Sequence, residues 1–364
     1  MASPSITSGS CFVLFAYDIA FAVNLDAAAT LHRESEREVL SHKRRTPSSF
    51  QYRPTPVRIV QTGEPLTIGG FSTSPRIEIT LFDFGAASVS YRIPLSGSLD
   101  GLLPLSDALY ENAALLADSR KRIADLLWTI NDALDKPHIA DFVEDYAIFQ
   151  IERIDQPSGP TITPDALIQS HRLLLAGILR AEKAPLSESE VQDALSARIA
   201  YTPGEASIID WNASILLLQE DAEDICAVLE YTNVELLEMR HLDDQLDDVL
   251  DRSRIHLNRP WWRALLPTDR AVRRVAELQM DSTLLFEGVN NALKLVGDQY
   301  LSRLYKLAAD RLHLPEWDAS ILRKLETAES IYQKLSDRQA TRRMEALEWI
   351  IIILIAVSTI LAFI

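Results

Sequence analysis

Cysteine is scarce in this chain, which has 2 cysteines among 364 residues. Cys11 and Cys226 are far apart, and neither has a second cysteine near it in the sequence. A small secreted domain held by disulfides needs several cysteines at short spacing, so that class of protein is excluded. Two isolated thiols are typical of a protein that works in a reducing compartment.

Glycine is also scarce, and none of the 12 glycines belongs to a phosphate-binding loop. Thr62-Gly63 and Gly69-Gly70 match neither the P-loop nor the dinucleotide fingerprint. The Gly-x-Ser-x-Gly turn of serine hydrolases is absent. The seven histidines are scattered and show no paired ligand spacing on one helix face. We therefore expect no enzyme activity, no catalytic residues, no cofactor and no metal site.

Positive charge is in the minority, because 36 Lys and Arg stand against 52 Asp and Glu, for a net charge of −16. Nucleic-acid binding depends on cationic side chains that neutralise phosphates, so nucleic acid is not an expected partner. The basic stretch Lys43-Arg44-Arg45, with Arg53 and Arg58, could contact phosphates of lipid or RNA. A solvated loop explains the same stretch more simply.

Long apolar runs are lacking except at the C-terminus, where Trp349 to Ile364 carries no charge. As a helix the run covers about 24 Å, against a hydrocarbon core of about 30 Å. Its aliphatic side chains favour insertion into a bilayer, and three preceding arginines predict a cytoplasmic N-terminal part. The N-terminus lacks the pattern of a signal peptide or presequence. We expect a single-pass protein of the cytoplasmic (inner) membrane, with lipid contacts at Trp349, Ile350, Ile351, Ile352, Ile353 and Leu354. The alternative is a helix buried in a partner or in an oligomer.

The first 218 residues predict an α+β domain with a mainly antiparallel sheet. Short segments rich in apolar and β-branched residues indicate strands, and Phe82-Asp83-Phe84-Gly85 indicates a hairpin turn. The expected strands are Phe12–Val23, Val57–Gln61, Ile77–Leu81, Ala86–Ile93, Phe142–Ile154, Arg198–Tyr201 and Ala206–Leu218. The expected helices are Asp26–His42, Ser106–Leu134, Pro164–Ala181 and Ser187–Ala197.

From residue 219 the apolar residues recur at alternating spacings of four and three, which is the pattern of a coiled coil. Asn258-Arg259-Pro260 and Pro315 separate the predicted helices, because proline removes a backbone donor. The sequence therefore predicts a long antiparallel helical stalk over 219–345, made of helices 219–258, 270–313 and 316–345. The stalk would join the 1–218 domain to a transmembrane anchor at 346–364.

The predicted loop after the first stalk helix contains Trp261 and Trp262 between arginines. If the first and third stalk helices run parallel, this loop lies near the membrane end. Paired indoles with flanking arginines suit the headgroup layer, so we also expect lipid contact at these two residues. The alternative is that both indoles cap the core of the stalk.

Acidic residues cluster in the first stalk helix, where Asp243, Asp247 and Asp251 recur every four residues and share one face. A cation site is conceivable there. We expect instead a solvated face, or ion pairs with the next helix through Arg270, Arg273 and Arg274.

Three short segments carry a resemblance to a known family. They are RRMEALEWIIIILIAV at 342–357, Phe82–Val89 around the hairpin, and Leu236–Arg240 with Leu242-Asp243. The segments are similar to parts of the "required for meiotic nuclear division" family, and the missing presequence indicates a bacterial-type member. The resemblance implies an α+β domain, long helices and a C-terminal hydrophobic helix. It implies no catalytic residues.

These features together predict a membrane-anchored, non-catalytic scaffold or tether. It would form homo-oligomers through its stalk and present the α+β domain to a cytoplasmic protein partner. The alternative is an oligomeric ion channel or transporter subunit, although one hydrophobic segment per chain and the missing Gly-Met-Asn signature disfavour it. An enzyme with an unrecognised site is the third reading.

Overall fold

The computed structural model describes residues 4–31, 35–37, 55–155, 162–218, 222–257, 278, 280 and 299–362. The chain forms two compact units. Unit 1 comprises Met1–Glu238 and Leu285–Pro315, and unit 2 comprises Met239–Leu284 and Glu316–Ile364. Unit 1 thus combines the N-terminal part of the chain with a segment from much later in the sequence.

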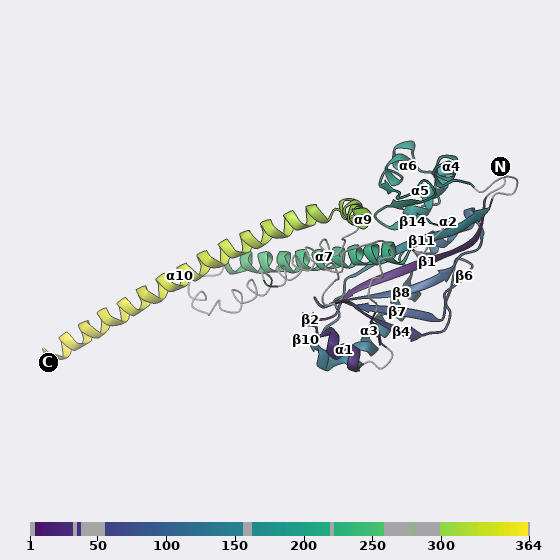
Figure 1. Cartoon of the computed structure of the whole chain (residues 1–364). Helices are drawn as coiled ribbons and strands as arrows, with labels where there is room; N and C mark the ends of the chain where they lie inside the picture. The colour runs from purple at the N-terminus through teal and green to yellow at the C-terminus, as the bar shows by residue number, and fades with distance from the viewer. Residues whose placement is uncertain are drawn as a thin grey trace. The chain divides into compact units, whose positions relative to one another are not determined.

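Unit 1 is built on a ten-stranded sheet, in which nine strands follow the order β12-β13-β14-β11-β1-β8-β7-β4-β3 and β9 pairs with β1 (Figure 1). Within this described sheet every pair is antiparallel except β11–β14, so the predicted α+β class with a mainly antiparallel sheet is confirmed. Its strands are β1 (Ser5–Asp18), β3 (Ser35–Arg37), β4 (Val57–Thr62), β7 (Arg76–Leu81), β8 (Ala86–Pro94), β9 (Gly97–Ser98), β11 (Val143–Asp155), β12 (Arg198–Ile199), β13 (Ala206–Ile209) and β14 (Ala213–Leu217). Two small sheets pair β2 (Ala22–Val23) with β10 (Leu134–Asp135) and β5 (Thr67–Ile68) with β6 (Phe71–Ser72).

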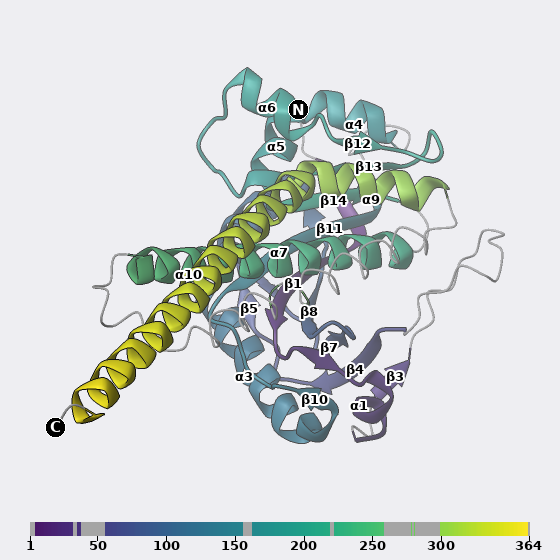
Figure 2. The ribbon, with the colours of Figure 1, turned by 90° about the vertical axis from the view of Figure 1, so that its left-hand side faces the viewer.

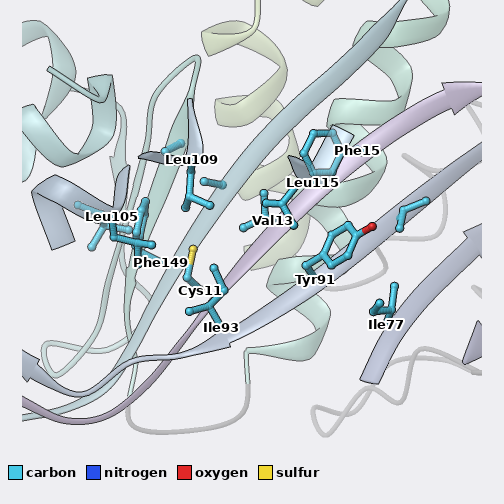
Figure 3. Close-up of a cluster of buried hydrophobic side chains, with 14 of the residues drawn as sticks. Cys11, Val13, Phe15, Ile77, Tyr91, Ile93, Leu105, Leu109, Leu115 and Phe149 are labelled. Carbon is cyan, nitrogen blue, oxygen red and sulfur yellow. The ribbon is translucent and has the colours of Figure 1, made fainter. Parts of the chain in front are cut away.

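The central strand β1 shows how side-chain alternation places the core. Cys11, Val13, Phe15 and Tyr17 point to one face because successive strand residues face opposite sides, and each is almost fully buried. Figure 3 shows the first three of these side chains together with Tyr91 and Ile93 of β8, Ile77 of β7 and leucines of the covering helices. Full burial of each large apolar side chain contributes roughly 1.5–3 kcal/mol. This layer is the main core of unit 1.

Helices cover that face of the sheet. They are α1 (Leu25–Leu31), α2 (Leu102–Leu109), α3 (Ala113–Ile130), α4 (Pro164–Ser170), α5 (Arg172–Arg180) and α6 (Glu188–Ala194), with 3₁₀ turns at Leu99–Gly101 and Asn131–Ala133. The Asn112 side chain caps α3 by accepting a hydrogen bond from the backbone of Leu115. Tyr91 of β8 donates to Asp118 of α3 at 2.6 Å, which fixes this helix on the sheet.

The first part of α7 (Glu223–Leu257) lies against the opposite face (Figure 2). Val234 and Leu237 pack on Ala16, Phe82 and Ala86. The side-chain amide of Asn233 donates to the backbone oxygen of Glu144 on β11 at 3.3 Å. The short helix α9 (Gln299–Arg311) joins this layer through Tyr305, whose hydroxyl donates to Glu235 at 2.7 Å. The sheet is therefore covered on both faces.

In unit 2 the later part of α7 pairs with α10 (Leu314–Ala362). Lys324 lies 2.8 Å from Asp243 and 2.6 Å from Asp247, and Tyr332 donates to the backbone oxygen of Val249 at 3.4 Å. Residues further along α7 contact residues further along α10, so the two segments run in the same direction. The expected acidic face exists, but its described cationic partner is Lys324 of α10. Arg270, Arg273 and Arg274 lie outside the described residues.

Two expectations at the ends of the fold need correction. Among the described residues no helix is both long enough and apolar enough to cross a membrane, so the predicted transmembrane anchor and single-pass membrane location are wrong. The physical reason is the short run, because extending it toward the N-terminus adds Glu348 and Glu345. The helix predicted for Asp26–His42 ends at Leu31, and Ser35–Arg37 pairs with β4 as an edge strand.

Candidate functional site

A cavity of about 390 Å³ lies between the sheet of unit 1 and the first turns of α7. Its volume falls within the range of small-molecule pockets, roughly 300–1,000 Å³. The lining combines polar and apolar side chains and comes mainly from β1, β4, β7, β8, β11 and α7. The residues are Phe12, Leu14, Arg58, Ser74, Arg76, Glu78, Thr80, Ser90, Arg92, Ile148, Gln150, Glu223, Cys226, Ala227 and Glu230.

Strand alternation places these polar groups on one face. On β7, Arg76, Glu78 and Thr80 line the cavity, while Ile77 and Ile79 between them enter the apolar core. The antiparallel register sets Glu78 opposite Ser90 of β8. Neighbouring strands therefore bring their polar positions together under α7, although these positions are distant in sequence.

Two of the three arginines in the cavity share carboxylates. Arg58 lies 3.4 Å from Glu78 and 3.5 Å from Glu223 of α7. Arg76 donates to the same Glu78 at 2.8 Å. These ion pairs connect β4, β7 and α7 within the lining of the cavity.

The third arginine, Arg92, is held differently. Its Nε donates to Ser10 Oγ at 3.0 Å, and its guanidinium carbon lies 6.0 Å from the centre of the Phe12 ring. In the described part of the chain no carboxylate pairs with it, and the side chain is exposed. Both contacts orient the guanidinium and leave its terminal nitrogens available to a ligand.

Glu230 of α7 is the most buried carboxylate among the residues that line the cavity. The residue is only 8% exposed, and its Oε1 has no hydrogen-bond partner. Burial raises the pKa of this carboxyl, while the charge of Arg58 and the nearby hydroxyls of Ser88 and Thr80 lower it. The Ser88 hydroxyl is near enough to affect this pKa, but its geometry makes no hydrogen bond.

A second polar cluster in unit 1 consists of arginines and carboxylates that form ion pairs with one another. The buried carboxylate of Asp210 accepts from Arg180 Nε at 3.1 Å and from Arg311 Nε at 2.8 Å. Both arginines also reach Asp193 of α6, and Arg180 pairs with Glu190. Burial lowers the pKa of Arg311, but the hydrogen bonds that Arg311 donates to Asp193 and the charge of Asp210 outweigh it, so the net pKa is raised. The cluster joins α5, α6, α9 and the β13–β14 turn, which is a structural role.

The predicted contact residues fall in different places. Trp349 to Leu354 lie on α10, where each side chain is 53–64% exposed. Trp261, Trp262, Arg53 and the stretch Lys43-Arg44-Arg45 lie outside the described residues. Arg58, considered above for phosphate contact, lines the cavity.

Arg92 and Glu230 were not singled out from the sequence. One signal was present, namely the alternation Ser88, Ser90, Arg92 opposite apolar Val89 and Tyr91 on β8. Alternation shows that a face is polar, but it does not show which helix covers that face.

The comparisons with known proteins concern mainly unit 1. The family model described as "Uncharacterized protein MJ0711, N-terminal domain" matches residues 8–224, more than half of the chain. The chain belongs to this family. A similar protein, "Uncharacterized protein MJ0711" of Methanocaldococcus jannaschii, is 24% identical over 237 residues, which cover 63% of this chain and 69% of the relative. No solved structure matches the chain.

These matches correct the family expected from the sequence. Nothing among them points to the "required for meiotic nuclear division" family, so that resemblance is wrong. It rested mainly on the C-terminal apolar run, which lies outside the matched residues 8–224. Short apolar segments are matched easily by chance because a few residue types fill them.

Proposed function

We propose that this protein is a non-catalytic scaffold that self-associates through the apolar end of α10 and presents unit 1 to a protein partner. One observation carries the proposal. Eight large apolar side chains in this segment are 48–64% exposed, namely Trp349, Ile350, Ile351, Ile352, Ile353, Leu354, Ile355 and Val357.

The size of this surface supports association. Eight half-exposed large side chains offer on the order of 800 Å², the area that one partner contributes to an interface of standard size. Burial at about 25 cal/mol per Å² would contribute roughly 20 kcal/mol. The entropic cost of association, about 4–15 kcal/mol, offsets much of this contribution.

The occupant that fits is a second copy of this chain. Consecutive helical residues point about 100° apart, so the apolar side chains from 349 to 355 surround the helix. A helix that is apolar on all sides requires cover on all sides, and several copies of the same segment supply it symmetrically. This arrangement favours a helical bundle of more than two copies over a coiled-coil dimer, which buries a single seam.

The test compares the molar mass of the full chain with that of the variant I352E/I355E by size exclusion with light scattering. We expect the unchanged chain to form a defined oligomer, and the charged variant to run as a monomer with unchanged helix content by circular dichroism. The matched control is W128E, because Trp128 is 90% exposed on α3 of unit 1. This control should keep the oligomer.

Two results would overturn the proposal. The unchanged chain could remain a monomer across the concentration range, or I352E/I355E could keep the oligomer. Loss of the oligomer in W128E as well would place the contact in unit 1.

A further inference from the structure

The geometry points to a binding site for a small organic anion in the cavity of unit 1, with the acidic group of the ligand on Arg92 and a polar group of the ligand on Glu230. The ligand class is a polyhydroxylated compound with one phosphate or carboxylate group. The inference concerns residues of unit 1 and is independent of the proposed association through α10.

Charge around the cavity leaves Arg92 as the anion-binding group. Glu78 and Glu223 neutralise Arg58, and Glu78 also contacts Arg76. Arg92 is oriented by Ser10 and Phe12 without a carboxylate partner among the residues that the structure describes. A guanidinium held in this way can bind a phosphate or carboxylate with two parallel hydrogen bonds. One such group suits one acidic group on the ligand.

Glu230 supplies the second, independent observation. It is more than nine-tenths buried, lines the cavity, and has an oxygen without a hydrogen-bond partner. Buried polar atoms in native proteins almost always have partners, so an unpartnered one requires an explanation. A hydroxyl of a ligand in the cavity would donate to this oxygen.

The backbone separation along β8 bounds the size of the ligand. Thr80 and Ser88 lie opposite each other on β7 and β8, and both are close enough to Glu230 to lower its pKa. Arg92 lies four residues further along β8. Four strand residues span about 14 Å. The cavity also offers Ser74, Ser90 and Gln150 along its polar lining. An elongated, hydroxyl-rich compound such as a sugar phosphate or sugar acid fits this spacing.

Glucose 6-phosphate, gluconate and neutral glucose are the probes for a test by calorimetric titration and thermal shift on the full chain. We expect the phosphate or the carboxylate probe to bind and raise Tm, while glucose does not. Comparison of glucose 6-phosphate with gluconate also shows whether the site prefers a phosphate or a carboxylate.

The variants test each end of the site. R92A should weaken binding of the anionic probe at least tenfold, and the control R172A should not, because Arg172 pairs with Glu188 outside the cavity. E230L should also weaken binding tenfold without lowering the Tm of the unliganded protein, and E230A, which likewise removes the acceptor oxygen, serves the same purpose if E230L does not fold. Absence of binding by both anions, or equal affinity in R92A and R172A, would overturn the inference.

Discussion

Two carboxylates of unit 1 show how their surroundings set opposite pKa shifts. Burial raises the pKa of Asp118, but hydrogen bonds from Arg122 at 2.7 Å and from Tyr91 at 2.6 Å outweigh it, so the net pKa is lowered. Glu230 is more deeply buried, and the nearby charge of Arg58 does not compensate, so its pKa is raised. The depth of burial therefore decides the direction of the shift, because both carboxyls have neighbours that lower the pKa.

The raised pKa of Glu230 predicts a pH-dependent effect of E230Q. Above the ordinary pKa of 4.5 the unfolded chain releases this proton while the folded protein still holds it. The stability contributed by the neutral carboxyl is therefore complete below that pH and is lost as pH rises through the folded-state pKa.

E230Q, which stays neutral, should unfold at a higher denaturant concentration than the unchanged chain at pH 7 and match it near pH 4. Urea unfolding at several pH values measures this difference. If E230Q and the unchanged chain have the same urea midpoint at pH 7 as well as at pH 4, the prediction is contradicted. D118N should show the opposite trend, with its largest loss at neutral pH, because Asp118 has a lowered pKa.

Single residues of the cavity were only partly predictable from the sequence. Arg58 attracted attention because it follows a basic stretch. Arg92 and Glu230 did not attract attention, because they come to line one cavity only through the register of β1, β7 and β8 and the placement of α7. Register depends on long-range pairing, which residue patterns within one strand do not contain.

At the scale of elements, the β7–β8 hairpin depends on Gly85. This residue has φ +103°, and an added Cβ would lie 1.9 Å from the backbone oxygen of Ala20. The oxygen of Gly85 also accepts hydrogen bonds from Ile19 and Ala20. The turn thus needs glycine both for its dihedral angle and for the close approach of the chain that follows β1.

G85A should destabilise unit 1 by more than the roughly 1–3 kcal/mol that an unfavourable backbone conformation costs. The matched control is G97A, because Gly97 has φ +102° and no atom within 4 Å of an added Cβ. Thermal unfolding of both variants separates the steric clash from the dihedral cost. A similar loss of Tm in both would show that the contact with Ala20 relaxes without cost.

Strands with clear alternation were predicted well, and polar edges were not. The predicted strand Val57–Gln61 is confirmed as β4, and Phe142–Ile154 as β11. Ser35–Arg37 falls within the helix predicted for Asp26–His42, yet it pairs with β4 at the edge of the sheet. At an edge, backbone pairing with the neighbouring strand decides the conformation more than the side chains do.

At the scale of the whole molecule, unit 1 depends on a segment from the C-terminal half of the chain. Arg311 of α9 reaches Asp210, which has no exposed surface, at 2.6 Å through its second terminal nitrogen. Tyr305 of the same helix donates to the buried Glu235. Residues 1–218 were predicted as a separate domain, and that boundary stays a prediction. The described contacts assign α9 to the same unit.

R311M should destabilise unit 1 by about 3 kcal/mol, the lower end of the cost of removing one partner from a buried ion pair, because Arg180 still binds Asp210. R303M is the control, since Arg303 lies exposed on the same helix. Thermal unfolding followed by near-UV circular dichroism measures both. Equal Tm values for the two variants would refute a structural role for the Asp210 cluster.

The position of β1 at the centre of the sheet has a consequence for synthesis of the protein. β1 leaves the ribosome well before its partner β11, and the hydrogen-bonded side chains of Ser8 and Glu152 are 144 residues apart. Pairing across such a separation closes a large loop and slows folding. The nascent N-terminal strand must therefore stay unpaired on one side until translation passes residue 155, a period in which chaperones have access to it.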